Sequence, residues 1–140
     1  MENKKFRPLF DKLFWWTLIP TAIIMIAMTV VSTFAPITLL ITIPVDIFAA
    51  YFFVSPFFGY AELRERSVYI KFGFLLKKEI PYCKIRKLQK DRKFYSESIV
   101  SLKNALDHVN IRYNNYDVAT VSVVDMDSFI EELNCRRASL

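Results

Sequence analysis

LFWWTLIPTAIIMIAMTVVST at residues 13–33 and PITLLITIPVDIFAAYFFVSPFF at residues 36–58 are the two stretches that decide the fold of this 140-residue chain. A helix that crosses the hydrocarbon core of a bilayer needs about 20 apolar residues, and each stretch is long enough. Residues 13–45 contain no Asp, Glu, Lys, Arg or His. Pro36 suits the first turn of the second helix, where its missing N–H is not needed. The sequence therefore predicts a transmembrane helical hairpin over residues 13–58.

Cations flank this predicted hairpin on both sides, and the turn between its helices carries no charge. The flanking cations are Lys4, Lys5, Arg7, Lys12, Arg64 and Arg66. Since positively charged flanks stay in the cytoplasm, we expect a multi-pass protein of the cell membrane with both termini cytoplasmic. Residues 1–12 are then a basic cytoplasmic N-terminus. Aromatic residues near the helix ends fit either interfacial belts or plain lipid-facing bulk: Trp15, Trp16, Tyr51 and Tyr60.

Asp46 lies near the middle of the second predicted helix. An acidic residue at that depth costs on the order of 3 kcal/mol on insertion scales, so we expect a compensating contact. The candidates are a hydroxyl of Thr17, Thr21 or Thr29 on the first helix, a partner subunit, or protonation of the carboxyl group. Two interpretations follow for Asp46: a functional intramembrane contact, or a hydrogen bond that only locks the hairpin.

Residues 59–140 differ in composition and predict a separate cytoplasmic domain. Residues 60–140 hold 15 of the 19 Lys and Arg and 11 of the 14 Asp and Glu. Residues 67–72 alternate as a strand, and residues 75–82 return as its hairpin partner. A second hairpin is predicted over residues 109–123, with its turn at Asn114-Asn115, because Asn tolerates the positive φ of tight turns.

A helix is predicted after these strands, with Asp125 as its N-cap. Its apolar residues recur at the spacing of one helix face: Met126, Phe129, Ile130 and Leu133. Strands followed by one closing helix predict an α+β domain. We expect a bent antiparallel sheet or a partly open barrel with a C-terminal capping helix.

Three stretches of the predicted domain resemble a known family: SVYIKFGFLLKKEIPYCKI at 67–85, DHVNIRYNNYDVATVSV at 107–123 and MDSFIEELNCR at 126–136. They are similar to the bacterial PH-like domains of the YyaB-like type, in which a membrane segment commonly precedes a small PH-fold unit. The resemblance implies a partly open, strongly bent antiparallel barrel with a C-terminal helix plugging one end, and it does not imply phosphoinositide binding. Some members are similar to bacteriocin self-immunity proteins, small membrane proteins that protect the producing cell.

Residues 84–93 carry six cations with Asp91 as the single acidic residue among them, and we call this stretch the basic segment. Its cations are Lys84, Arg86, Lys87, Lys90, Arg92 and Lys93. Near an anionic leaflet each cation contributes about 1 kcal/mol, so the segment is a candidate surface for anionic lipid headgroups or for a partner. The alternative is a solvated, solubilising face. Ile85 and Leu88 point inward from either a bulged strand or a short helical turn.

The sequence contains no recognisable catalytic or metal-binding constellation. It has one histidine, two glycines and two cysteines, which leaves no Gly-rich phosphate loop, metal-ligand spacing or disulfide framework. We expect His108 to be a surface or strand residue, Cys83 and Cys135 to be reduced thiols, and Arg136-Arg137 to lie on a solvated helix face. The basic segment lacks the stacking aromatics that bind nucleic acid. We therefore expect no enzyme activity, no cofactor and no nucleic-acid partner.

The sequence favours a membrane-anchored, non-enzymatic binding module with a role in peptide-toxin self-immunity. Its expected partners are the bilayer, anionic headgroups, and a membrane protein or peptide toxin. The alternative is a structural or regulatory subunit of a membrane complex that contacts its partners through the hairpin and Asp46.

Overall fold

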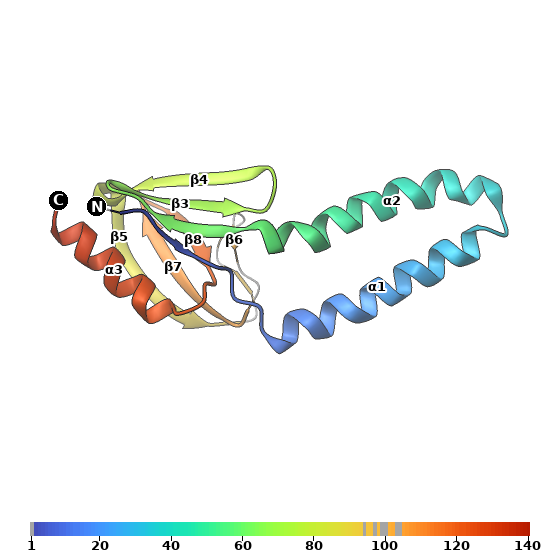
Figure 1. Ribbon diagram of the computed structural model, residues 1–140, viewed down its shortest axis with the longest axis horizontal. Helices are drawn as coiled ribbons and strands as arrows, with labels where there is room; N and C mark the ends of the chain where they lie inside the picture. Colours follow the sequence, from blue (N-terminus) through green and yellow to red (C-terminus); the bar gives the residue numbers. More distant parts are fainter. Residues whose placement is uncertain (1, 94, 97, 99–100, 103–104) are drawn as a thin grey trace.

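Two long helices leave the folded domain together and meet at their far ends in the computed structural model (Figure 1). The structure describes residues 2–93, 95–96, 98, 101–102 and 105–140. Helix α1 spans Lys12–Ser32, helix α2 spans Pro36–Val54, and the 3-10 helix η1 at Ser55–Phe58 leads from α2 into the domain. Both α1 and α2 are long and apolar enough to cross a membrane, and neither is buried inside the protein.

The described part of the domain contains two four-stranded sheets. The first has the order β1-β2-β3-β4 and is antiparallel, with strands Lys4–Phe6, Tyr60–Leu63, Ser67–Phe72 and Leu76–Pro81. The second has the order β5-β7-β8-β6, with β5 at Ile85–Arg92, β7 at Asp107–Tyr113, β8 at Asp117–Val121 and β6 at Ser101–Leu102. The 3-10 helix η2 at Tyr82–Lys84 links the two sheets. Strands β5, β7 and β8 pair antiparallel, whereas β6 pairs parallel to β8.

The hydrophobic core lies between the two sheets and helix α3, which spans Met126–Ala138. Its fully buried side chains alternate along the strands and recur along one face of α3: Leu63, Val68, Ile70, Val109, Ile111, Val121, Phe129 and Leu133. Phe129 meets Phe6 of β1 edge to face, with ring centroids 5.1 Å apart. The Asp125 carboxylate caps α3 by accepting the Ser128 N–H at 3.4 Å. Strand β1 and helix α3 thus share one core although they lie at opposite ends of the sequence.

This architecture confirms the predicted fold class of two long apolar helices followed by a sheet domain with a C-terminal helix. Over the described residues, the two sheets do not close into a barrel. Strands β1 and β2 were not predicted, and they pair with each other across the two helices, with Phe6 opposite Ala61. The segment Lys4–Phe6, expected to be part of a basic N-terminus, is therefore a strand of the domain.

Candidate functional site

Helices α1 and α2 join the domain through direct contacts at their bases, a region we call the junction. The Asp11 carboxylate caps α1 through the Leu13 N–H at 2.7 Å and also accepts the Leu106 N–H at 3.0 Å. This backbone hydrogen bond from Leu106 lowers the pKa of Asp11. At α2, Gly73 in the β3–β4 turn has φ of +92°, and a Cβ there would lie 1.7 Å from Ser55 Oγ. These contacts hold the domain against the helices in one orientation.

Aromatic rings surround the junction. Phe10 and Phe57 stack with their centroids 4.8 Å apart, and Trp15 lies 5.9 Å from Phe57. On the other side, Phe58 of η1 and Phe74 of the β3–β4 turn lie 4.6 Å apart. Trp, represented here by Trp15, and Tyr are the side chains enriched where a membrane protein crosses from hydrocarbon to headgroups. The rings therefore mark the level at which a bilayer would end.

The basic segment runs along β5 as a bulged strand, with the register shift between Ile85 and Lys87. A strand rises about 3.3 Å per residue, so the six cations are spread over roughly 25 Å instead of forming one compact cluster. At one end, the Lys84 carbonyl accepts the Asn114 N–H near the β7–β8 turn. At the other end, Lys93 N–H donates to the Leu106 carbonyl, the residue whose N–H binds Asp11. Only the Arg92 and Lys93 end of the basic segment therefore lies near the junction, as the course of β5 in Figure 1 also shows.

Acidic or polar groups of the domain contact four of these six cations. Arg86 donates to Asn115 Oδ1 at 2.7 Å, and Lys90 pairs with Asp127 at 2.9 Å. Lys93 pairs with Asp91 at 2.9 Å, and its hydrogen bond lowers the pKa of Asp91. Arg92 lies 3.8 Å from Asp107. Within the described part of the chain, Lys84 and Lys87 are the members with exposed side chains and no such contact. The positive charge of the segment is thus partly compensated within the domain.

The hydrogen-bond partner of Asp46, a residue of α2, lies on the neighbouring helix α1. Thr29 Oγ1, one of the three predicted hydroxyl donors, donates to Asp46 Oδ2 at 2.5 Å. One turn closer to the helix–helix connection, the hydroxyls of Ser32 and Thr42 lie 3.0 Å apart. Side-chain hydrogen bonds between helices are a common means of association in lipid. The acidic group that a bilayer would penalise therefore has a donor on the neighbouring helix.

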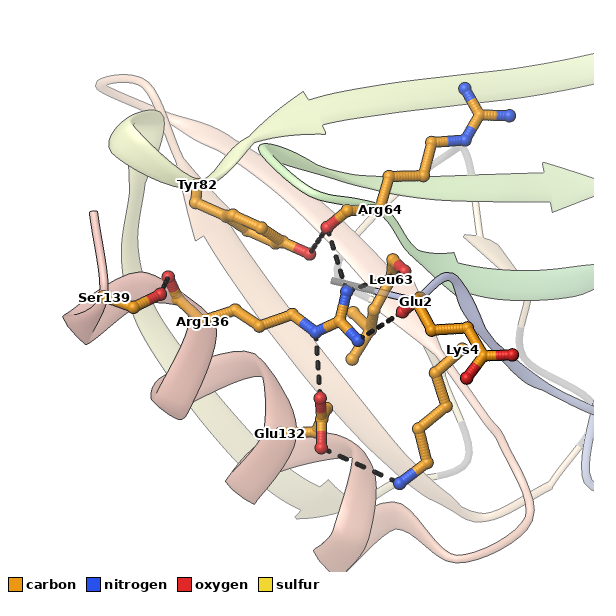
Figure 2. Close-up of polar contacts among 8 residues, drawn as sticks. All are labelled: Glu2, Lys4, Leu63, Arg64, Tyr82, Glu132, Arg136 and Ser139. Atoms are coloured by element: carbon orange, nitrogen blue, oxygen red, sulfur yellow. Dashed lines mark hydrogen bonds and ion pairs between the residues drawn. The ribbon is translucent and has the colours of Figure 1, made fainter.

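Arg136 departs from the sequence interpretation, which placed it on a solvated helix face. Its side chain is 4% exposed, and Figure 2 shows its guanidinium between α3, β2 and the N-terminal segment. It donates to the carbonyls of Leu63 at 3.1 Å, Arg64 at 3.2 Å and Glu2 at 2.8 Å. It also donates to Glu132 at 2.9 Å, and this hydrogen bond is the main cause that lowers the pKa of Glu132. Arg136 therefore joins α3 to β2 and to the N-terminal segment inside the domain, and it is not a surface charge.

Two further predictions are refined at this point. His108 is a strand residue of β7, as one interpretation had it, but it is fully buried, with Nδ1 2.9 Å from the Leu106 carbonyl. Cys83 and Cys135 are exposed and unpaired. In the described ranges, no group of three or more His, Cys, Asp and Glu residues is placed to hold a metal ion.

Residues 60–137, from β2 to the last turns of α3, match the bacterial PH domain family. The match covers more than half of the chain, and the protein belongs to this family. No curated protein and no solved structure matches the chain. The matched bacterial PH domain begins at β2, so the two long apolar helices precede it, and β1, which lies before the helices, adds a strand to its first sheet.

Proposed function

We propose that this protein is a membrane-anchored, non-enzymatic binding module, with α1 and α2 crossing the cell membrane and both termini on the cytoplasmic side. The pairing of β1 with β2 carries the proposal. These strands lie before and after the two helices, and strands on opposite sides of a bilayer cannot pair. The chain between β1 and β2 must therefore cross the membrane an even number of times, and its two apolar helices provide two crossings.

The exposed apolar surface of the helices supports the same conclusion. Ile37, Leu40 and Ile41 are more than 70% exposed, as is Phe34 in the connection between the helices. Contiguous apolar surface on this scale marks contact with a membrane or another protein. The basic flanks favour the orientation with the domain inside.

Labelling of single cysteines in intact cells tests the topology. In a variant with Cys83 and Cys135 replaced by Ser, we expect Phe34→Cys to react with a membrane-impermeant maleimide from outside. Tyr116→Cys is the matched control, because Tyr116 is 96% exposed on the β7–β8 turn of the domain. It should react only after the cells are permeabilised. Labelling of Tyr116→Cys in intact cells would overturn the orientation.

For the narrower role, we propose peptide-toxin self-immunity, supported by the resemblance of residues 67–85, 107–123 and 126–136 to the YyaB-like type, some members of which are similar to such immunity proteins. Expression of the chain in toxin-sensitive cells should then protect them, and equal killing with and without it would contradict the role. The alternative, a subunit of a membrane complex that binds partners through Asp46, is less well supported, because Thr29 within the same chain already binds this carboxylate.

A further inference from the structure

We propose that the turn between β3 and β4 inserts into the headgroup region of the membrane, with Lys71 and Lys77 contacting the phosphates of anionic lipids. We call Phe74, Leu75 and Leu76 the β3–β4 tip. This inference rests on the proposed membrane anchoring and adds a second contact surface to it. The site differs from the basic segment, which lies on β5 of the other sheet.

The β3–β4 tip is apolar and exposed although it belongs to a turn. Phe74, Leu75 and Leu76 are 43%, 77% and 58% exposed. Turns that face water are rich in Gly, Pro, Asn, Asp and Ser, and a run of three large apolar residues at such a position calls for a partner.

The place of the tip identifies that partner. Phe74 lies 4.6 Å from Phe58 of η1 and 5.9 Å from Tyr51 of α2, measured between ring centroids. Gly73 packs on Ser55 with no room for a side chain, so the turn is fixed against the end of α2. Figure 1 shows the turn beside that end of the helix. The medium around the last turn of α2 is therefore also the medium around the tip.

The length of α2 indicates which layer of the membrane surrounds its last turn. At about 1.5 Å per residue, the 19 residues Pro36–Val54 span nearly the full 30 Å of a typical hydrocarbon core. Ser55–Phe58, and with it the tip, then falls at the level of the lipid headgroups. Phe, Leu and Tyr side chains at this level bury apolar surface without entering the centre of the bilayer.

The charges next to the tip fit an anionic surface. Lys71 of β3 and Lys77 of β4 lie directly opposite each other, and Lys78 is opposite Ile70. Like charges across a strand pair destabilise a sheet, and an anion between them removes the repulsion. Residues 67–78 contain no Asp or Glu, and no ion pair of Lys71 or Lys77 is found among the described residues. A phosphate-bearing leaflet supplies the missing anions.

Depth-dependent quenching of a fluorophore tests the insertion on the full chain. A single NBD label is placed at Leu75→Cys, in the variant with Cys83 and Cys135 replaced by Ser, and the chain is incorporated into nanodiscs with 30% anionic lipid. We expect a blue-shifted emission and at least twofold quenching by lipids spin-labelled near the headgroup. Ile26→Cys on α1 is the positive control and is measured with lipids spin-labelled on the acyl chain, because it would lie inside the hydrocarbon core. Tyr116→Cys on the distant β7–β8 turn is the negative control for both kinds of spin label.

The controls distinguish insertion of the β3–β4 tip from membrane anchoring by α1 and α2. Quenching at position 26 with water-like emission at position 75 overturns the insertion and leaves the anchoring intact. Absence of quenching at both positions contradicts the anchoring itself.

A second comparison tests the lysines. The double variant Lys71→Gln/Lys77→Gln should halve the quenching at position 75 or reduce it further, and discs of purely zwitterionic lipid should do the same. Lys84→Gln/Lys87→Gln removes the same charge from the far end of the basic segment and should leave the quenching unchanged. Equal quenching in the parent chain, in both double variants and in the zwitterionic discs overturns the assignment of the phosphate contact to Lys71 and Lys77.

Discussion

The guanidinium of Arg136 joins parts of the chain that are far apart in sequence, since it binds the carbonyls of Glu2, Leu63 and Arg64. Replacement of Arg136 by Ala removes this donor from the carbonyls of Glu2 and Leu63, and it leaves the Arg64 carbonyl with the hydrogen bond from the Tyr82 hydroxyl. We expect a loss of about 3 kcal/mol in the free energy of unfolding, measured by urea titration of the full chain in detergent. Arg137→Ala is the matched control.

Arg137 donates to the Ile85 carbonyl at 3.0 Å and is more exposed than Arg136. Its replacement should cost about 1 kcal/mol, the usual value for one hydrogen bond. Equal losses in the two variants would show that the contacts of Arg136 with the N-terminal segment and β2 carry no special weight.

Glu132 makes the stability of the domain depend on pH. The hydrogen bond from Arg136 lowers its pKa in the folded state below the ordinary value of 4.5. The unfolded chain therefore binds the proton first on acidification, so this contribution is complete above pH 4.5 and is lost as the pH falls through the lowered value. Glu132→Gln should flatten the decline in urea midpoint over this range. Glu131→Gln, on the adjacent exposed position, should leave the decline as it is in the parent chain.

At the scale of elements, helix α3 holds the two sheets together through its buried face. Phe129 is fully buried and packs against Phe6 of β1. Phe129→Ala should cost about 3–5 kcal/mol, the usual range for removing a buried aromatic ring. Glu131→Ala on the exposed face should change the stability by less than about 0.5 kcal/mol. A similarly small change for Phe129→Ala would mean that α3 is an appendage of the domain.

The pair of helices α1 and α2 offers its own test. Thr29→Val keeps the size of the side chain but removes the donor to Asp46, and the helix–helix association should weaken by about 1 kcal/mol. Thr21→Val is the matched control, because the Thr21 hydroxyl donates only within α1, to the Thr17 carbonyl at 2.6 Å. Titration with a denaturing detergent, followed by energy transfer between labels on the two helices, measures the difference. Equal stability of the two variants would exclude the Asp46 contact as a lock.

The apolar periodicity of short sequence stretches predicted the helices and hairpins whose residues lie close together in the sequence. The two apolar helices, the β3–β4 and β7–β8 hairpins and α3 each carry their period within a short stretch, and all five are present. Strand β1 has only three residues, two of them lysines, and nothing near it in the sequence indicates that it pairs with residues 61–63. Arg136 was misplaced for the same reason, because the backbone carbonyls that accept its hydrogen bonds lie 72 to 134 positions away. The apolar run Phe74–Leu76 was visible in the sequence, but its place beside α2 was not.

At the scale of the whole molecule, the contacts of Asp11 and Gly73 make the helices and the domain one unit. Each helix is attached to a different sheet region, α1 through Leu106 and α2 through the β3–β4 turn. A force or a partner that changes the spacing of the helix bases would therefore act directly on the domain. With α1 and α2 in a membrane, as proposed, this coupling places the Lys84 end of the basic segment away from the membrane surface.

The pairing of β1 with β2 imposes an order on the biosynthesis of the protein. Lys4–Phe6 is translated before both helices and its partner Tyr60–Leu63 after them. At a translation rate of about 5–20 residues per second, roughly 3–11 s pass between the synthesis of β1 and the synthesis of β2. During that interval it is an unpaired strand, and Lys4 and Lys5 protect it from wrong pairing, as lysines do on exposed sheet edges. The first sheet is therefore completed only after the ribosome has synthesised both helices, so in the proposed membrane-anchored protein the domain cannot finish folding ahead of its anchor.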